Sequence, residues 1–251
     1  MKELKFFDAS CTVGGTMMDS GHDTACLLKE MDRAGVERAL VVHACVATAP
    51  QVANQQIAKE IKIAPDRLVG VWCMLPQQCP EIPGEDVIFD MMHEQGIGAL
   101  TLNPYEHLYV ACRMTLGRMM DAAAERKVPV FLDCFDQHWK DLYDFVAEFP
   151  KNVFIFRANW GKWGYDRQIR PLLENYAGFH FALNGYWVPE GIRDLVELYG
   201  SDRLLFASGF PVYNLGNQML QLKYSGLPTE DIVKIAGGNM ERLMREAGLD
   251  V

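Results

Sequence analysis

Short apolar runs alternate with longer amphipathic runs along the whole chain. The longer runs, such as 24–35, 113–127 and 191–200, repeat apolar residues at helical spacing. The shorter runs are rich in Val, Leu, Ile and Phe, as buried strands are. The strand-like runs cover residues 4–8, 38–43, 67–75, 97–103, 128–134, 152–159, 179–185 and 202–208. This alternation predicts a parallel sheet whose strands are joined by helices.

The number of repeats and the chain length favour a closed barrel. Eight strand–helix units in 251 residues are typical of a single (β/α)8 barrel. We therefore predict an α/β fold, one TIM barrel domain over residues 1–251. A doubly wound open sheet is the main alternative, and it usually has a glycine-rich phosphate turn after its first strand. Gly14-Gly15 is only a weak match to such a turn. Gly35, Gly96 and Gly200 each follow a helix-like run, where a left-handed C-cap is expected.

Charge and composition narrow the class of partner. The net charge of -9 argues against nucleic acid or an anionic membrane surface as the partner. We expect a small-molecule ligand. The sequence shows no signal-peptide pattern and no bilayer-spanning apolar run, so we expect a cytoplasmic protein. The 7 cysteines include no C-x-x-C pair, which indicates reduced thiols rather than a disulfide framework.

Polar residues follow several predicted strands, at the end of a barrel where active sites lie. The segments around them are FDASCTVG, PDRLVGVWCMLP, NVFIFRANWG, DRLLFASGFP and IAGGNMERLM. In order and spacing, these segments resemble the amidohydrolase-related family, the decarboxylase-like branch of the metal-dependent hydrolase barrels. The resemblance spans nearly the whole chain. It implies a TIM barrel of hydrolase ancestry, and it makes a homo-oligomer a reasonable expectation.

The residues that would bind metal in this family are replaced here. The resemblance places Ser10 and Thr12 where the first strand of the family carries two histidines. It places Asp133 and Asn159 at two further histidine positions, and Gly209 at the position of the aspartate that shuttles a proton. Hydroxyls and an amide are poor zinc ligands. We therefore predict a degenerate metal site, with no metal and no cofactor.

A cation from the protein itself is a candidate replacement for the metal. Strand alternation directs Arg157 and Asp133 into the barrel mouth on neighbouring strands. We expect Arg157 to hold an anionic ligand, with Asp8, Ser10, Thr12 and Asn159 around it. The alternative is a purely structural ion pair.

Two kinds of side chain add to this prediction. Asp133 and His43 are the candidate acid/base residues, although a histidine at a strand end is more often bonded to a backbone carbonyl. Trp160 and Tyr213 are candidates to line a pocket for an aromatic ligand, or else a subunit interface. We place His22 and His180 in loops or on helix surfaces. The strand-end cysteines are apolar filler or, less readily, a soft-metal site.

The sequence thus predicts an amidohydrolase-like barrel that has lost its metal centre and binds a small organic anion at its mouth. One alternative is a metal-independent hydrolase, lactonase or lyase that acts on a small carboxylate. Another is a non-catalytic assembly or ligand-binding protein. A metal retained by Asp8, Asp133 and a cysteine is a further alternative. Whether catalysis survives is left open.

Overall fold

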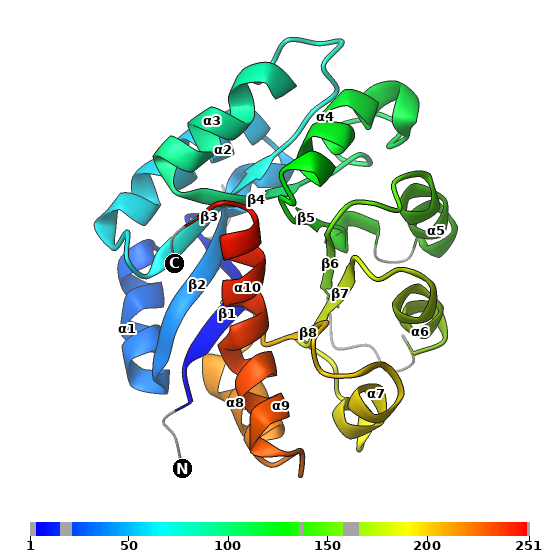
Figure 1. Ribbon diagram of the computed structural model, residues 1–251. Helices are drawn as coiled ribbons and strands as arrows, with labels where there is room; N and C mark the ends of the chain where they lie inside the picture. The colour runs from blue at the N-terminus through cyan, green and yellow to red at the C-terminus, as the bar shows by residue number, and fades with distance from the viewer. Residues whose placement is uncertain (1–3, 16–21, 136–137, 158–165, 250–251) are drawn as a thin grey trace.

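Eight parallel strands form a nearly closed barrel in this computed structural model, which describes residues 4–15, 22–135, 138–157 and 166–249. The strands follow one another around the sheet in chain order, so the predicted single TIM barrel is confirmed (Figure 1). They are β1 (Phe6–Val13), β2 (Val36–His43), β3 (Leu68–Cys73), β4 (Ile97–Thr101), β5 (Val130–Phe131), β6 (Phe154–Arg157), β7 (Phe179–Ala182) and β8 (Leu204–Leu205).

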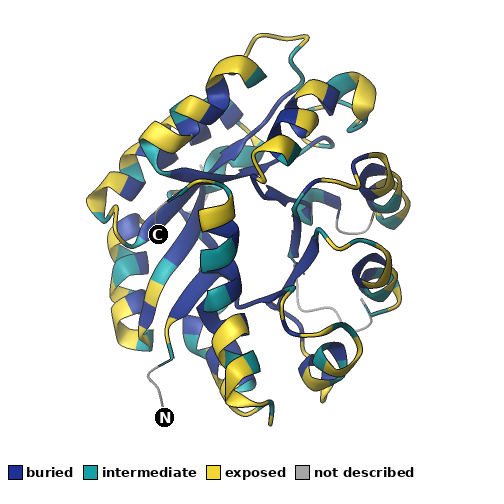
Figure 2. Ribbon diagram, in the orientation of Figure 1, coloured by how far each residue is buried: buried dark blue, intermediate teal, exposed yellow. Residues whose placement is uncertain are grey.

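Helices alternate with the strands and surround the barrel, with their outer faces exposed and the strands buried (Figure 2). They are α1 (Thr24–Ala34), α2 (Pro50–Glu60), α3 (Glu85–Gln95), α4 (Arg113–Glu125), α5 (Trp139–Glu148), α6 (Asp166–Asn175), α7 (Gly191–Tyr199), α8 (Leu215–Lys223), α9 (Thr229–Val233) and α10 (Asn239–Glu246). As predicted, α1 and α3 end at left-handed glycines, Gly35 with φ 77° and Gly96 with φ 74°. The left-handed cap predicted for Gly200 is wrong, because its ψ of 168° after α7 is extended.

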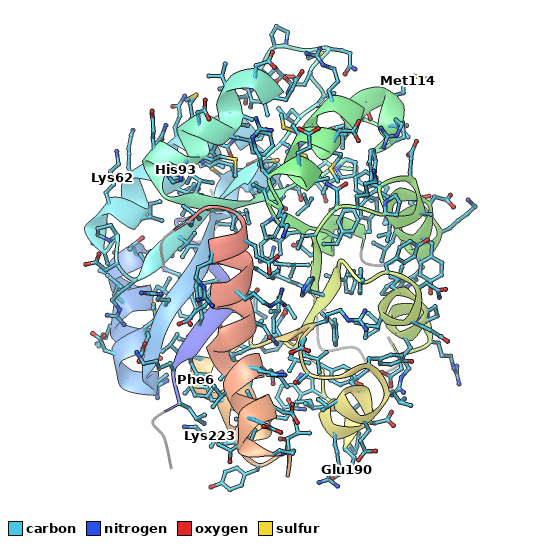
Figure 3. All side chains as sticks on the ribbon, in the orientation of Figure 1. Phe6, Lys62, His93, Met114, Glu190 and Lys223 are labelled. Atoms are coloured by element: carbon cyan, nitrogen blue, oxygen red, sulfur yellow. The ribbon has the colours of Figure 1, made fainter. Side chains whose placement is uncertain are left out.

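Two hydrophobic cores hold the barrel together. The larger one fills the layer between the strands and the surrounding helices. The smaller one fills the barrel interior and contains Phe7, Leu40, Phe131 and Ile155. Met240, Leu243 and Met244 of α10 pack against this interior core, and α10 lies across the barrel end (Figure 1). Figure 3 shows side chains filling the space within the ring of strands. With α10 packed on the interior, a ligand site falls to the opposite end, where the strands finish.

Backbone hydrogen bonds join the first strand to the last segment of the barrel. Ala9 donates to the Phe206 carbonyl at 3.0 Å, and Thr12 donates to the Phe210 carbonyl at 2.9 Å. Gly209 donates to the Ser10 carbonyl at 3.1 Å, so the contact runs in both directions. These bonds bring the residues after β8 beside the C-terminal end of β1, which is where the candidate site forms.

The surface position expected for His180 is wrong. His180 lies within β7 with 3% of its surface exposed, and its Nδ1–H donates to the Gly178 carbonyl at 3.0 Å. Burial disfavours the charged imidazolium and lowers the pKa of His180 to about 4. Among the described residues, none of the helices is both long enough and apolar enough to span a bilayer.

Candidate functional site at the barrel mouth

A cavity of about 530 Å³ lies at the C-terminal end of the barrel. Its described lining comes from the ends of strands that are far apart in the sequence. The lining includes Ser10, Thr12, Gly14, His22, Ala44, Asp133, Arg157, Asn184, Gly209 and Tyr213. Five predicted site residues, namely Ser10, Thr12, Asp133, Arg157 and Tyr213, therefore share one cavity. Asn159 and Trp160 lie outside the described residues.

Arg157 reaches across the mouth. It ends β6, and its Nη2 donates to Asp133 Oδ2 at 2.5 Å, so the predicted ion pair is present. Its Nη1 donates to Ser10 Oγ at 3.3 Å on β1, which is on the opposite side of the barrel from β5. The guanidinium carbon also lies 4.7 Å from the centre of the Phe131 ring. The guanidinium is therefore held near the middle of the mouth.

This ion pair is mostly buried but only partly satisfied. The side chains of Arg157 and Asp133 are 11% and 18% exposed. Within the described part of the chain, Arg157 Nε and Asp133 Oδ1 are buried without a hydrogen-bond partner. A buried donor and a buried acceptor without partners are costly unless a further group bonds to them. The pair therefore still has one N–H to donate and one carboxylate oxygen to accept.

Asp8 lies on β1, two residues before Ser10, and has no exposed surface. Its Oδ1 accepts from the backbone N–H of Ser10 at 3.0 Å and of Ser208 at 2.9 Å. Burial raises the pKa of Asp8, while the hydrogen bonds from Ser208 and Ser10 oppose that rise. The carboxyl thus connects β1 with the segment after β8 and fixes the position of Ser10. Its predicted contact with a ligand stays a prediction.

Thr12 and Tyr213 stand at the outer part of the cavity, and each is partly exposed. Gly209 lies between them with φ 76°, a conformation that favours glycine. A Cβ added to Gly209 would lie 3.0 Å from Tyr213 Cδ2. Glycine at this position therefore lets the Tyr213 ring approach the backbone, and the ring forms part of the cavity lining.

His43 is half-buried at the end of β2, and its ring lies against Gly14. Its Nδ1 is 3.0 Å from Cys45 Sγ and 3.3 Å from the Cys45 backbone nitrogen. The imidazole is thus bonded to Cys45 and not to a backbone carbonyl. Ala44, the residue between them, lines the cavity, whereas Arg157 approaches it from β6. Acid/base work by His43 on a ligand at Arg157 stays a prediction.

The described part of the mouth shows no cluster of metal-binding side chains, and the predicted loss of the metal centre stays a prediction. In the described ranges, no three His, Cys, Asp or Glu side chains are grouped so that they could hold a metal ion. Ser10 and Asp133 stand at two positions where the amidohydrolase-related family carries metal-binding histidines. Both side chains are bonded to the guanidinium of Arg157. The guanidinium of Arg157, which carries a permanent positive charge, therefore lies between these two side chains.

Two residues of the cavity, His22 and Asn184, are not among the predicted site residues. His22 lies in a loop before α1, as predicted, and it lines the cavity; its ring meets that of Phe210 edge-on, with 5.7 Å between centroids. Asn184, two residues after β7, also lines it. The signal for Asn184 was its position just after a strand, which it shares with Asp133. For His22 there was no local signal, because tertiary contacts bring it to the mouth, among them the bond from Gly14 N to its carbonyl at 2.9 Å.

The family model described as Amidohydrolase matches residues 14–245. The chain belongs to the amidohydrolase family. No curated protein matches it significantly in sequence.

Solved structures of this family share the fold of the chain. An uncharacterised TIM-barrel protein from Bordetella bronchiseptica is 17% identical with a TM-score of 0.73, and the match covers 98% of this chain and 100% of that one. A 2,6-dihydroxybenzoate decarboxylase complexed with 2,6-dihydroxybenzoate is 15% identical, with a TM-score of 0.74 over 97% and 100% of the two chains. A dihydroxybenzoic acid decarboxylase from Polaromonas sp. JS666, with bound manganese and 2-nitroresorcinol, is 15% identical with a TM-score of 0.73 over 97% of each chain. This amidohydrolase barrel is thus related in fold to decarboxylases.

Proposed function

We propose that this amidohydrolase-family barrel binds a small organic anion at its C-terminal mouth, and that Arg157 provides the positive charge in place of a metal ion. The observation that carries the proposal is the position of the guanidinium, bonded at once to Ser10 and Asp133. A guanidinium is always charged and can donate two parallel hydrogen bonds to a carboxylate or phosphate.

Several features of the mouth support a ligand over a purely structural ion pair. The cavity of about 530 Å³ is large enough for a small organic acid. Arg157 Nε has no partner within the described residues, so the guanidinium keeps a donor for an incoming group. A closed mouth packed with apolar side chains would instead have favoured an assembly protein without a ligand.

A second candidate is a metal-independent hydrolase, lactonase or lyase that acts on a small carboxylate. The unpartnered Asp133 Oδ1 favours it, because this oxygen can accept a proton or hydrogen bond from a ligand held by the adjacent Arg157. In this reading Arg157 orients the anionic end of the substrate, and Asp133 moves a proton at its Oδ1. The Asp133→Asn variant separates the two functions, since it removes turnover but keeps Arg157 for binding.

Metal analysis and ligand titration test the proposal together. Protein purified without chelator is assayed for zinc, manganese and iron, and we expect far less than one metal ion per chain. Acetate, succinate, citrate and benzoate are then titrated calorimetrically. We expect at least one of them to bind and Arg157→Gln to weaken that binding by about tenfold or more, the loss of a charge-assisted hydrogen bond.

Arg33→Gln is the matched control, because Arg33 pairs with Glu30 at the surface and leaves the mouth untouched. We expect it to bind the same acid as the wild type. One equivalent of metal that is lost in Asp133→Ala would overturn the proposal. Equal affinity of the wild type and Arg157→Gln for the bound acid would do the same.

A further inference from the structure

Cys45 and His43 form a close pair at the end of β2 that the proposed function does not use. The Cys45 sulfur lies 3.0 Å from His43 Nδ1. The backbone N–H of Cys45 points at the same nitrogen, with the two nitrogens 3.3 Å apart. Cys45 is partly exposed, in the short 3-10 helix Ala44–Ala47 whose N-cap is His43.

The backbone contact fixes the direction of the hydrogen bond from the thiol. A backbone N–H can only donate, so His43 Nδ1 must present its lone pair to it. The same lone pair then faces the sulfur, and the thiol is the donor of the S–H···N bond. The ring proton of the neutral imidazole is consequently on Nε2. This is the tautomer in which a histidine is ready to take a proton from the neighbouring thiol.

Gly14 holds the imidazole in this orientation. It has φ 85°, and a Cβ added to it would lie 2.2 Å from His43 Nε2. Any side chain at position 14 would therefore displace the ring. The ring lies between the backbone of Gly14 on one side and Cys45 on the other.

We propose that Cys45 and His43 are a nucleophile–base pair at the rim of the mouth cavity, reactive toward small uncharged alkylating or acylating electrophiles. The Cys45 sulfur forms the new S–C bond, and the thiol proton passes to His43 Nδ1. The leaving group departs with the electrons of its bond, and a basic leaving group takes the proton back from His43. Ala44 lines the cavity between the two residues, which places the pair beside a space that a small molecule can enter.

The electrostatics of the pair agree with a neutral thiol and a neutral base. Burial raises the pKa of Cys45 and lowers that of His43. Glu60 at the end of α2 opposes the shift of His43, and its Oε2 accepts from Thr24 Oγ1 at 2.6 Å. On the Gly14 side, the described residues include one more titratable group, His22, whose carbonyl accepts from Gly14 N. At neutral pH the proton therefore stays on sulfur until an electrophile arrives.

The pH dependence of alkylation tests the pair in the folded full-length protein. Iodoacetamide is the probe, and peptide mass spectrometry follows each cysteine separately. Because the base is already unprotonated above its lowered pKa, we expect the Cys45 rate to be nearly constant between pH 6.5 and 8. Cys79 is exposed and serves as the internal reference. Its alkylation rate should rise with pH, because iodoacetamide reacts with the thiolate.

His43→Asn is the informative variant, since the Asn side-chain oxygen can still accept from the Cys45 N–H but is no base. We expect Cys45 alkylation at pH 6.5 to fall at least tenfold and its pH profile to become parallel to that of Cys79. Cys45→Ser confirms the peptide assignment. A wild-type Cys45 profile that rises in parallel with Cys79 overturns the proposal, even if the variant does not fold. An unchanged rate in folded His43→Asn overturns it as well.

Discussion

Arg157 joins three strands of the barrel through one side chain. It ends β6, lies over Phe131 of β5 and donates to Ser10 of β1. Its pairing with Asp133 could be predicted from the sequence, because alternation on two neighbouring strands directs both side chains inward. Its bond to Ser10 could not be predicted, since it depends on the side chain reaching across the barrel. The central position of the cation is thus a property of the tertiary structure.

The buried ion pair makes a testable contribution to stability. Arg157→Met and Asp133→Leu each leave one charge buried without its partner, and we expect each to lower the free energy of unfolding by about 3 kcal/mol. The double variant should lose much less than the sum of the two, because apolar side chains then replace both charges. Urea unfolding of the four proteins measures this coupling. Additive losses would show that the two side chains do not stabilise one another.

The strands show where local pattern is sufficient and where it is not. Alternating runs located all eight strands, but the run at 202–208 forms only Leu204–Leu205 as β8. Past that point, Phe206 donates to the carbonyl of Ile235 at 2.9 Å, in the π-helical turn Lys234–Gly238 before α10. A segment almost thirty positions away in the chain thus ends the strand, and no local pattern signals it.

Strand β7 also contains the histidine that was misplaced. The run FHFALNG was recognised as a strand, but a polar residue within it was assigned to the surface. His180 instead satisfies its Nδ1–H on the Gly178 carbonyl and is buried. A hydrogen bond to the preceding turn is what makes a buried imidazole tolerable here. The hydrogen bond between His180 and Gly178 could not be predicted from the sequence, because it depends on the direction of the His180 side chain in the folded protein.

His180 predicts how β7 responds to acid. Its pKa is lowered from 6.5 to about 4 in the folded chain, so the unfolded chain binds the proton more readily between these values. Stability is therefore retained above pH 6.5 and lost as the pH falls toward 4, by about 3 kcal/mol from this residue. Urea unfolding from pH 7 to 4 measures the loss. His180→Asn keeps an N–H for Gly178, and we expect it to show a clearly shallower slope.

At the scale of the whole molecule, the two ends of the barrel differ in structure: one is covered by a helix and the other carries a polar cavity. Helix α10 packs Met240, Leu243 and Met244 on the interior core, while the other end holds the polar cavity. This division was predictable in outline from the fold class, since sites in such barrels lie at the C-terminal strand ends. The residues that pack on the interior core were not predicted, because the closing helix has no counterpart in the strand–helix alternation.

Helix α10 covers one end of the interior core, and we expect this packing to contribute to the free energy of unfolding. Leu243 is 1% exposed, and we expect Leu243→Ala to lower the free energy of unfolding by about 3 kcal/mol through a cavity in that core. Leu198→Ala is the matched control, because Leu198 on α7 is 58% exposed and its loss should cost about 0.5 kcal/mol or less. Thermal and urea unfolding of both variants give the comparison. Equal costs would mean that α10 contributes little to the core.

The guanidinium at the mouth determines how the proposed anion-binding site is completed after the chain is synthesised. A centre that depends on a free ion must acquire it after synthesis, in competition with every other chelator in its surroundings. Arg157 arrives with the chain, and folding alone brings it between Ser10 and Asp133. Maturation of this centre is therefore finished when the barrel has closed and Ser10 of β1 and Asp133 both lie within reach of Arg157. On the proposed function, scarcity or excess of metal in the medium leaves it unaffected.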